Sequence, residues 1–456
     1  DFYTLFFSLL GKYSEMEALS RAVKEIRKTN KAIRIWGGFR LVGFEGMNEE
    51  ENQIFSRNNL VNMVKKARAF TLNKDFDNAI RALEQALDMT YSMNDRESGQ
   101  KILKELVWTS VQGGKWSKAA LYQQPIYQSA QASGNTELIV NAGNTLATFY
   151  YREGEYKQAA EIKQDLITYL ENNHYYDMAP LYESLALIHA AARDFDQAVE
   201  KMKQTEQIYK TRNDTASLAA SEIWLGRFEL ERDNFQPSIR HFEQGIQLLT
   251  SAETKNDLFQ LASAYQLIGL AYERLSMYKQ ALNFQKKGLS VFSALKSSLQ
   301  EAQSWQYIAN VEWKTGNYRQ AFNSQHKALE GFKKYGALKH LIMGYSTLGL
   351  IKMSLGDYKQ AFEDEQQALD LCGQDPAYLS DKSSVLKNLG LIMIQQQEFT
   401  RSLEYFQQAT KIDSSLNSSR GLAYDVRNQG IVKLYLNQIQ KGIGFLEKGL
   451  TLSQNL

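Results

Sequence analysis

The sequence is poor in proline and cysteine and has no long hydrophobic run, and each shortage narrows the class of protein. Only 4 prolines occur in 456 residues. Because proline breaks helix interiors, this predicts helix almost throughout. The single cysteine, Cys372, excludes a disulfide framework and a multi-cysteine metal site. No run approaches the roughly 20 apolar residues that a membrane-spanning helix requires; the one candidate, residues 2–10, is far shorter.

An excess of charge of one sign is also missing. The chain has 53 basic and 51 acidic residues, for a formal net charge of +2, which gives no global reason to expect nucleic acid as a partner. Its 43% hydrophobic and 23% charged residues are typical of a soluble globular chain. The length exceeds the roughly 100–200 residues of an ordinary domain. The chain therefore contains several domains or one elongated repeat array.

One short pattern recurs along the chain: an aromatic residue, two variable residues and a small residue, as in Tyr358-Lys359-Gln360-Ala361. We call the small residue the anchor. The anchors are Ala79, Ala119, Ala159, Ala198, Ser238, Ala281, Ala321, Ala361, Ser402 and Gly442. Successive anchors are 39 to 43 residues apart, and only the tenth copy has lost the aromatic residue. Such a fixed period predicts a repeat array.

Two further positions, twelve residues before and seven residues after the anchor, hold Ala or Gly in most copies. Three copies depart at the later position, with Ile126, Leu166 and Thr205. Short polar turns such as residues 314–317 and 354–357 lie between the first small position and the anchor. Glycine and Asn or Asp there end one helix and start the next. Each copy is thus a helix A, a tight turn and a helix B, and the small residues let the two helices approach closely.

This pattern, complete in Leu348-Gly349, Tyr358, Ala361 and Ala368, resembles the tetratricopeptide repeat (TPR) family. The resemblance covers residues 58–456 in about ten copies. The period is about 40 rather than the usual 34 residues, as in Leu-Gly-Asn (Pins-type) scaffolds, kinesin light chains and bacterial TPR regulators. The loop proline of the family is missing. The resemblance implies an all-α fold, a right-handed α-solenoid of helix-turn-helix repeats.

Residues 1–57 do not fit the register, so we expect an N-terminal helical cap followed by the array over residues 58–456. An amphipathic, basic helix is predicted over residues 14–31, where it would cover the first hydrophobic face of the array. The alternative is the remnant of a signal or anchor. The basic residues of this segment would suit a membrane surface or nucleic acid, but we favour a solvated helix face and do not favour membrane contact through residues 1–40.

Two features of the chain's length carry further expectations. The 43-residue step places about three extra residues in the loop around residues 251–257, where we expect a flexion point. The chain begins with Asp1 rather than Met and stops at Leu456, within or just after the last helix. We therefore expect it to be part of a longer protein.

No constellation of catalytic or metal-ligating residues is present in the sequence. The five histidines lie in different repeats, and none forms a two-histidine spacing on one helix face. His241 and His326 are interpreted as surface or packing residues of B helices, and Cys372 as a lone thiol. The short glycine pairs are not followed by the Gly-Lys-Ser/Thr of a phosphate loop. We predict a protein that is not an enzyme and needs no cofactor, metal or small-molecule substrate.

The resemblance places the A helices on the concave surface of the superhelix, so that positions 18, 15, 11, 8 and 7 before each anchor face a groove. The candidate partner-binding residues are Asn144, Tyr151, Arg152, Arg227, Gln266, Arg274, Gln306, Asn310, Trp313, Met353, Lys387, Tyr424 and Arg427. Aromatic and arginine side chains are enriched at binding hot spots. Trp313 is the strongest candidate, because an exposed tryptophan in a groove is costly without a use. For each residue the alternative is packing between adjacent A helices.

We therefore predict a non-enzymatic scaffold that binds a peptide segment or a protein domain in its groove. The alternatives are a sensor or regulatory module of a larger multidomain protein, and self-association through a poorly capped end. The clamp of TPR proteins that bind chaperone tails is absent, since Asn388 and Asn428 occupy one of its positions without the partner residues. We expect a cytoplasmic protein, with a periplasmic or membrane-attached one as the alternative, and no nucleic acid partner.

Overall fold

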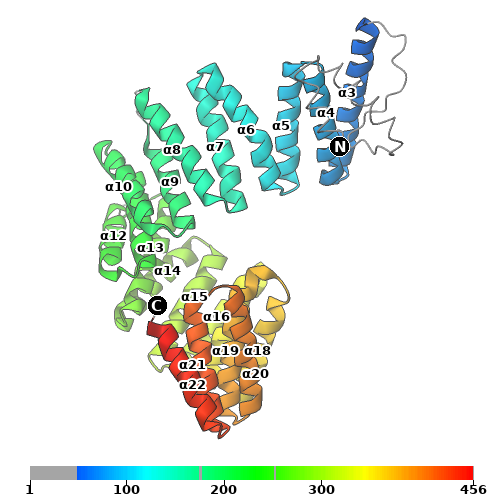
Figure 1. Cartoon of the computed structure of the whole chain (residues 1–456). Coiled ribbons are helices and arrows are strands. Elements are labelled where there is room, and N and C mark those ends of the chain that lie inside the picture. The colour runs from blue at the N-terminus through cyan, green and yellow to red at the C-terminus, as the bar shows by residue number, and fades with distance from the viewer. Residues whose placement is uncertain (1–48, 174–176, 251–252, 455–456) are drawn as a thin grey trace, which may run out of the picture. The chain divides into compact units, whose positions relative to one another are not determined.

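The computed structural model describes residues 49–173, 177–250 and 253–454. Within these ranges the chain forms twenty α-helices and one short 3-10 helix, and no strand (Figure 1). The predicted fold class is confirmed: the protein is an all-α solenoid of consecutive helix pairs. None of the described helices is long and apolar enough to cross a membrane. The helix predicted over residues 14–31 lies outside the described residues.

The chain divides into two compact units, Asp1–Leu166 (unit 1) and Ile167–Leu456 (unit 2), and the division falls within helix α8. The helices of unit 1 are α3 (Glu49–Leu72), α4 (Phe76–Ser92), α5 (Arg96–Gln112), α6 (Trp116–Ser133), α7 (Thr136–Glu153) and the first part of α8 (Tyr156–Asn172).

The helices of unit 2 are the rest of α8, α9 (Ala179–Ala191), α10 (Phe195–Thr211), α11 (Thr215–Glu231), α12 (Phe235–Leu248), α13 (Lys255–Arg274), α14 (Tyr278–Ala294), α15 (Ser298–Lys314), α16 (Tyr318–Tyr335), α17 (Leu338–Ser354), α18 (Tyr358–Cys372), the 3-10 helix η1 (Pro376–Tyr378), α19 (Leu379–Gln395), α20 (Phe399–Ser415), α21 (Ser419–Tyr435) and α22 (Ile439–Gln454). Repeats 1 to 10 are the pairs α3–α4 to α21–α22, so the odd-numbered helices are the A helices.

A left-handed residue ends helix A in every repeat. The residue five positions before the anchor has a positive φ in all ten copies, whether it is Gly356 (φ 83°) or Arg193 (φ 62°). Such a residue turns the chain away from the helix and lets the following N–H groups bond to its last carbonyls. The next residue often starts helix B, as Asp357 does by accepting a hydrogen bond from the Gln360 N–H. The turn predicted at residues 354–357 is confirmed.

Small residues allow side chains of helix B to lie directly against helix A. A Cβ added at Gly226 would lie 2.8 Å from the ring of Phe242, and one at Gly390 would lie 2.8 Å from the ring of Phe406. Both rings are fully buried. Glycine twelve residues before the anchor thus makes room for the residue four positions after it, which fills the space between the two helices.

The extra residues of the 43-residue step lie in the linker between α12 and α13. This linker runs from 249 to 254, of which 251–252 lie outside the described residues, whereas residues 295–297 suffice between α14 and α15. The added length therefore separates two repeats and leaves the helix pairs on either side intact.

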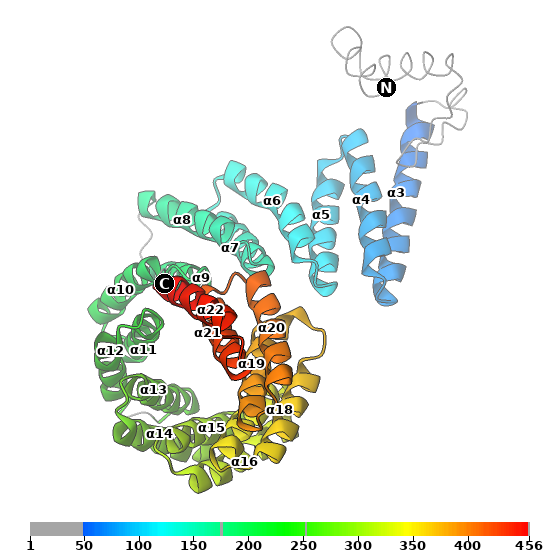
Figure 2. The same cartoon turned by 60° about the horizontal axis from the view of Figure 1, so that its bottom comes forward.

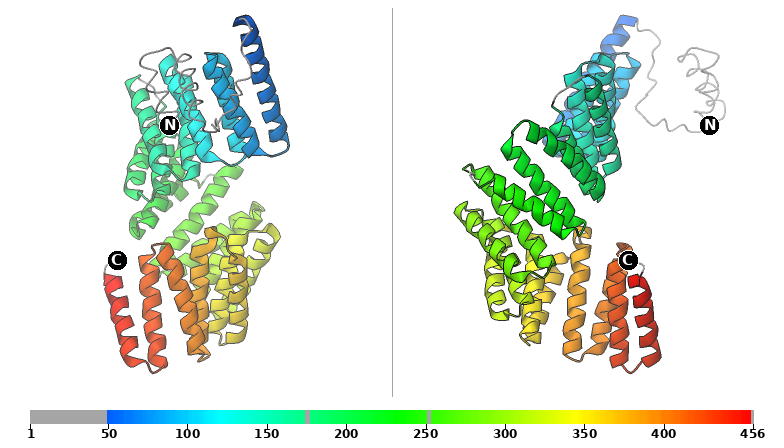
Figure 3. Two further views of the ribbon diagram at one scale, coloured as in Figure 1. Left: turned by 45° about the vertical axis from the view of Figure 1, so that its right-hand side comes forward. Right: turned by 90° about the vertical axis from the view of Figure 1, so that its left-hand side faces the viewer.

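Within unit 2 the A helices form the inner side of a curved array. Figure 2 shows α11, α13, α15 and α19 on the inner side, with α10, α12, α14 and α18 outside them. Each helix packs on the next one along the chain, and the A helices of neighbouring repeats also touch between α11 and α19. Figure 3 shows the C-terminal helices, in orange and red, side by side in alternating direction. The inner face of unit 2 is therefore built from one helix of each repeat.

Candidate partner-binding surfaces

Two of the predicted arginines stand out in unit 2, on the consecutive A helices α11 and α13. Arg227 and Arg274 are both exposed, and neither forms an ion pair with any described residue. The Arg227 guanidinium lies over the Trp224 ring, 5.2 Å from its centroid. Burial raises the pKa of the Tyr307 hydroxyl on α15, and the positive charge of Arg227 partly offsets this effect. The charge of Arg227 on α11 is thus felt at Tyr307 on α15.

The predicted amide residues of repeats 6 and 7 bind neighbouring repeats. Gln266 Nε2 donates a hydrogen bond to Ser304 Oγ at 2.7 Å, joining α13 to α15. Gln306 is only 5% exposed, and Asn310 is half-buried. Gln266 thus packs between adjacent A helices, which is the alternative role that the sequence left open, and Gln306 is too buried to offer its side chain to a partner.

Trp313 is also engaged within the array. Its ring is half-buried, and its Nε1 donates a hydrogen bond of 2.8 Å to Ser354 Oγ on α17. Met353, on the same helix as Ser354, packs with the buried residues Ile392 and Met393. Trp313 is thus bound to the next repeat. It is not the exposed groove tryptophan that the sequence suggested.

The last A helices bury a cluster of charges. Lys387 Nζ on α19 lies 2.6 Å from Asp413 Oδ2 and 3.7 Å from Asp425 Oδ1. Asp425 is fully buried, and burial raises the pKa of its carboxyl to about 7. Lys387 also lies over the ring of Tyr424, as does the exposed Arg427 at 5.0 Å from the ring centroid. Of the predicted residues here, Arg427 alone is exposed.

The predicted residues of unit 1 lie on α7. Asn144 Oδ1 accepts a hydrogen bond of 2.7 Å from Lys163 Nζ, and burial lowers the pKa of this lysine to about 8. Tyr151 is 40% exposed and packs edge-on against Tyr156. Arg152 is exposed and lies over the ring of Trp116 on α6, at 5.7 Å from its centroid. Tyr151 and Arg152 are accessible, whereas Asn144 satisfies a buried cation.

One aromatic residue at a position predicted to face the groove is not among the candidate residues. Trp108 on α5 is 54% exposed, and it lies eleven residues before the anchor Ala119. This is one of the positions predicted to face the groove, occupied by Arg227 in repeat 5 and Asn310 in repeat 7. Applying the register to repeat 2 as well would have found it. Trp108 is therefore an exposed tryptophan at a position that the register predicts to face the groove.

The histidines and the cysteine take structural positions. His241 Nδ1 lies 2.7 Å from Glu222 Oε2, within the helix pair α11–α12. The His326 ring lies edge-on to Phe322. Cys372 is buried, and burial raises the pKa of its thiol to about 11, which leaves it protonated and weakly nucleophilic. The described residues contain no group of three or more potential metal ligands.

Two family models match parts of the chain. The model for anaphase-promoting complex subunit 5 matches residues 64–232. A tetratricopeptide repeat model matches residues 262–294, which hold most of α13 and all of α14. The chain is a tetratricopeptide-type repeat protein. The TPR copy that this model recognises follows the long linker and has the regular features of the array: a buried anchor, Ala281, and a left-handed turn residue, Ser276.

Solved structures share the TPR fold at low sequence identity. The apo form of the quorum sensor NprR from B. thuringiensis is 14% identical, with a TM-score of 0.55 over 75% of this chain and 99% of that chain. A signal transduction ATPase with a tetratricopeptide repeat sensor, from Pyrococcus horikoshii, is 14% identical, with a TM-score of 0.54 over 99% of this chain and 71% of that one.

Aspartyl phosphate phosphatase F from Bacillus subtilis is 13% identical, with a TM-score of 0.51 over 87% of this chain and 94% of that chain. No curated protein sequence matches the chain. At these identities the similarity establishes a common TPR architecture, and function has to be argued from the surfaces of this chain.

Proposed function

We propose that the protein is a non-enzymatic scaffold that holds a peptide segment or a domain of a partner protein on the inner face of unit 2. The observation that carries this proposal is the pair of unpaired, exposed arginines, Arg227 and Arg274, on consecutive A helices. Other cations of the A helices are paired with neighbouring repeats, as Lys314 is with Glu273 at 2.8 Å.

Arginine suits this role because its planar guanidinium presents several N–H donors that match a carboxylate. Stacking on Trp224 holds the Arg227 side chain in place, so less side-chain entropy is lost on binding. The half-buried Tyr307 offers a hydroxyl near the same position. We therefore expect the bound segment to place Asp or Glu side chains against α11 and α13.

The similar structures support a recognition role in general terms. One is named a quorum sensor, and another is described by its tetratricopeptide repeat sensor. The latter favours a second candidate function, a sensory module within a larger protein, since its similarity extends along 99% of this chain. Immunoprecipitation with an antibody against this chain, followed by peptide mapping of the native protein by mass spectrometry, would distinguish the two. A sensory module would be recovered together with the peptides of a covalently attached effector domain.

The test of the scaffold is affinity capture from source lysate with three baits: wild type, the double variant Arg227→Ala/Arg274→Ala, and the control Arg240→Ala. Arg240 is exposed on the outer helix α12 and has no ion pair among the described residues. A captured partner is then divided into overlapping synthetic peptides, and their affinities for the three proteins are measured by fluorescence anisotropy.

The proposal expects a partner, and an acidic peptide from it, that wild type and Arg240→Ala bind equally. The double variant should bind this peptide at least tenfold more weakly, because each lost charge-assisted contact is worth roughly 1–3 kcal/mol. Equal binding by all three proteins would refute recognition by this face. Trp313→Ala is not used, since removing that ring disturbs the contact between α15 and α17.

A further inference from the structure

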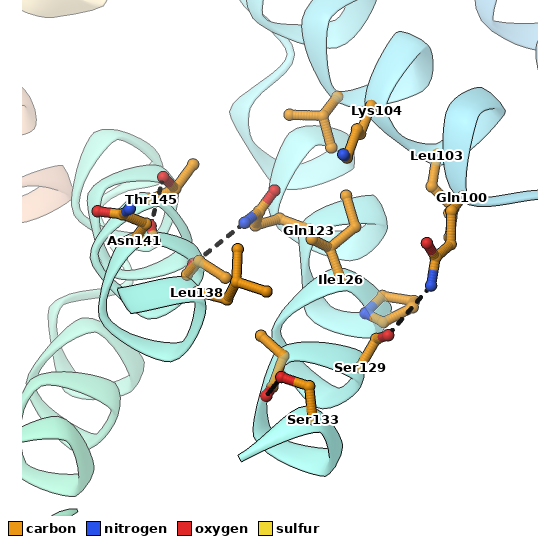
Figure 4. Close-up of a pocket in the computed structure, with 14 residues that line it drawn as sticks. Gln100, Leu103, Lys104, Gln123, Ile126, Ser129, Ser133, Leu138, Asn141 and Thr145 are labelled. Atoms are coloured by element: carbon orange, nitrogen blue, oxygen red, sulfur yellow. Dashed lines mark hydrogen bonds between the residues drawn. The ribbon is translucent and has the colours of Figure 1, made fainter. Parts of the chain in front are cut away.

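Unit 1 contains a pocket lined by none of the residues proposed to bind a partner in unit 2. It has a volume of about 540 Å³ and lies among α5, α6 and α7. Leu103 on α5, Ile126 on α6 and Leu138 on α7 line it from three sides, as Figure 4 shows. Its size falls within the roughly 300–1,000 Å³ of typical ligand sites.

The pocket lies in a repeat that departs from the small-residue pattern. Seven residues after the anchor, Gly245 and Gly288 lie so close to helix A that an added Cβ would be 3.3 Å and 3.1 Å from a carbonyl oxygen of that helix. Repeat 2 has Ile126 at this position, preceded by Pro125 inside α6. Pro125 and Ile126 both line the pocket, and Ile126 packs against the buried cluster that includes Leu103 and Leu106 of α5.

The polar atoms around the pocket are mostly bonded to protein. Gln123 Nε2 donates to the Ala142 carbonyl at 3.1 Å, and Gln100 Nε2 donates to Ser129 Oγ at 3.2 Å (Figure 4). A ligand therefore meets a surface that is chiefly apolar. Its contacts would be made by hydrocarbon, with little need to break existing hydrogen bonds.

Lys104 is the exception. It is the only charged residue that lines the pocket, it is exposed, and it forms no ion pair with a described residue. The neighbouring cations Arg68 and Lys101 are neutralised by Glu105 and Glu97. One helical turn beyond Lys104, the exposed ring of Trp108 continues the surface along α5. An apolar pocket, a free cation and an exposed aromatic ring thus occur side by side.

We propose that this pocket binds a peptide segment of a partner protein, with apolar side chains entering the space between α5 and α7 and an adjacent carboxylate meeting Lys104 Nζ. The charge of Lys104 selects an acidic flank, and the lining of Leu103, Ile126 and Leu138 selects aliphatic or aromatic side chains. The backbone leaving the pocket passes over Trp108. Unit 1 thereby supplies a second recognition site, which does not depend on the proposed function of unit 2.

The probes are fluorescein-labelled peptides of sequence Gly-Ser-Glu-Φ-Φ-Glu-Ser-Gly, in which Φ is Leu, Met or Phe, and matching peptides with Lys in place of Glu. Their binding to the full chain is measured by fluorescence anisotropy. We expect at least one acidic peptide to bind, and its Lys counterpart to bind at least tenfold more weakly. Decanoate is used as an unlabelled competitor, to separate a peptide site from a site for free amphipathic acids.

Two pairs of variants locate the site. Ser129→Phe places a ring in the pocket mouth and should abolish binding, whereas Gln128→Phe, at the adjacent exposed residue outside the lining, should not. Lys104→Glu should weaken the acidic peptide at least tenfold and restore binding of the Lys peptide. Lys157→Glu, at an exposed lysine outside the pocket, should change neither. The exchange of preference in Lys104→Glu cannot result from misfolding.

Three results would overturn this proposal: no binding of any acidic peptide at millimolar concentration, equal binding by wild type and Ser129→Phe, or saturation by decanoate without peptide binding. The Arg227→Ala/Arg274→Ala protein should bind the probes as wild type does. Failure in unit 1 can thus be distinguished from failure of the proposed role of unit 2.

Discussion

Repeat 2 and repeat 8 have different side chains at the two positions where most repeats have Ala or Gly. Twelve residues before the anchor, repeat 2 has Val107 and repeat 8 has Gly349; seven residues after it, they have Ile126 and Ala368. Ala368 is fully buried between its helices, whereas Ile126 and Val107 line an open pocket. At these two positions repeat 8 thus has small residues within the helix pair, whereas repeat 2 has larger side chains that line the pocket.

The two repeats also differ in the group buried four residues after the anchor, Gln123 and Glu365. The amide of Gln123 satisfies a backbone carbonyl. Glu365 is fully buried, and its Oε1 accepts hydrogen bonds from Ser346 at 3.1 Å and Asn388 at 2.9 Å. Gly349 makes room for it, since a Cβ there would lie 2.8 Å from Glu365 Cγ. At this position repeat 8 thus buries a carboxyl group, whereas repeat 2 buries an amide.

The strongest way to break this difference is to give repeat 8 the side chain of repeat 2. Ala368→Ile forces three extra carbons into a fully buried position, and we expect a loss of about 3 kcal/mol in the free energy of unfolding. Urea denaturation followed by circular dichroism measures this loss. Amide hydrogen exchange should place it in α17 and α18.

The reciprocal change, Ile126→Ala, is the control, because Ile126 is half-buried at the pocket and its removal should cost only about 1 kcal/mol. If Ala368→Ile is tolerated as well as Ile126→Ala, side-chain volume does not determine which helix pair opens.

The second prediction gives repeat 8 the amide of repeat 2. Burial raises the pKa of Glu365 well above its ordinary value of 4.5. The folded protein therefore holds the proton more tightly than the unfolded chain, and stability falls as the pH rises above about 4.5. We expect Glu365→Gln to be more stable than wild type at pH 8, by on the order of 1–2 kcal/mol.

At pH 4.5 the difference in unfolding free energy should be much smaller, because the carboxyl is then neutral in the folded protein and only half-ionised in the unfolded chain. The charged groups packed nearby, Asp364 and its partner Lys352 at 2.6 Å, are retained in the variant. Parallel stability curves for the two proteins between pH 4.5 and pH 8 would show that Glu365 does not take up a proton on folding.

The smallest expected effect concerns a feature that the two repeats share. Gly114 and Gly356 occupy the left-handed turn position with φ of 66° and 83°, and an added Cβ would meet no atom within 4 Å. Alanine should therefore cost only the backbone conformational energy, about 1 kcal/mol in either repeat. Thermal or urea denaturation of the two variants measures it. Unequal losses would mean that the turns, and not only the helix interiors, differ between the repeats.

Much of the fold was predictable from the sequence because the period is carried by residues that packing constrains. Anchors such as Ala361 are buried because two helices meet there, and Gly356 is required by a left-handed turn. The confirmed helix pairs and turns follow from these local rules. The division within α8 had no such signal, since the anchor pattern continues through it.

The candidate surface was harder to predict. The register identifies which side of an A helix faces inward, but it does not reveal which side chains a neighbouring repeat binds. Arg274 remains free whereas Trp313 donates to Ser354, a partner 41 residues away. The pocket of unit 1 was visible in the sequence only as the irregular Ile126. The equal departures Leu166 and Thr205 do not line the pocket, so a departure from the pattern alone would not have located it.

The left-handed residue at one fixed place in every turn has a consequence for how this chain can change in length. Because every repeat turns from helix A to helix B through the same backbone geometry, a cut at one anchor matches a cut at the next. Joining Ala281 directly to Phe322 would remove one whole repeat and bring the remaining turns back into phase. The array can be shortened or extended in steps of about 40 residues without altering the turn inside any remaining repeat.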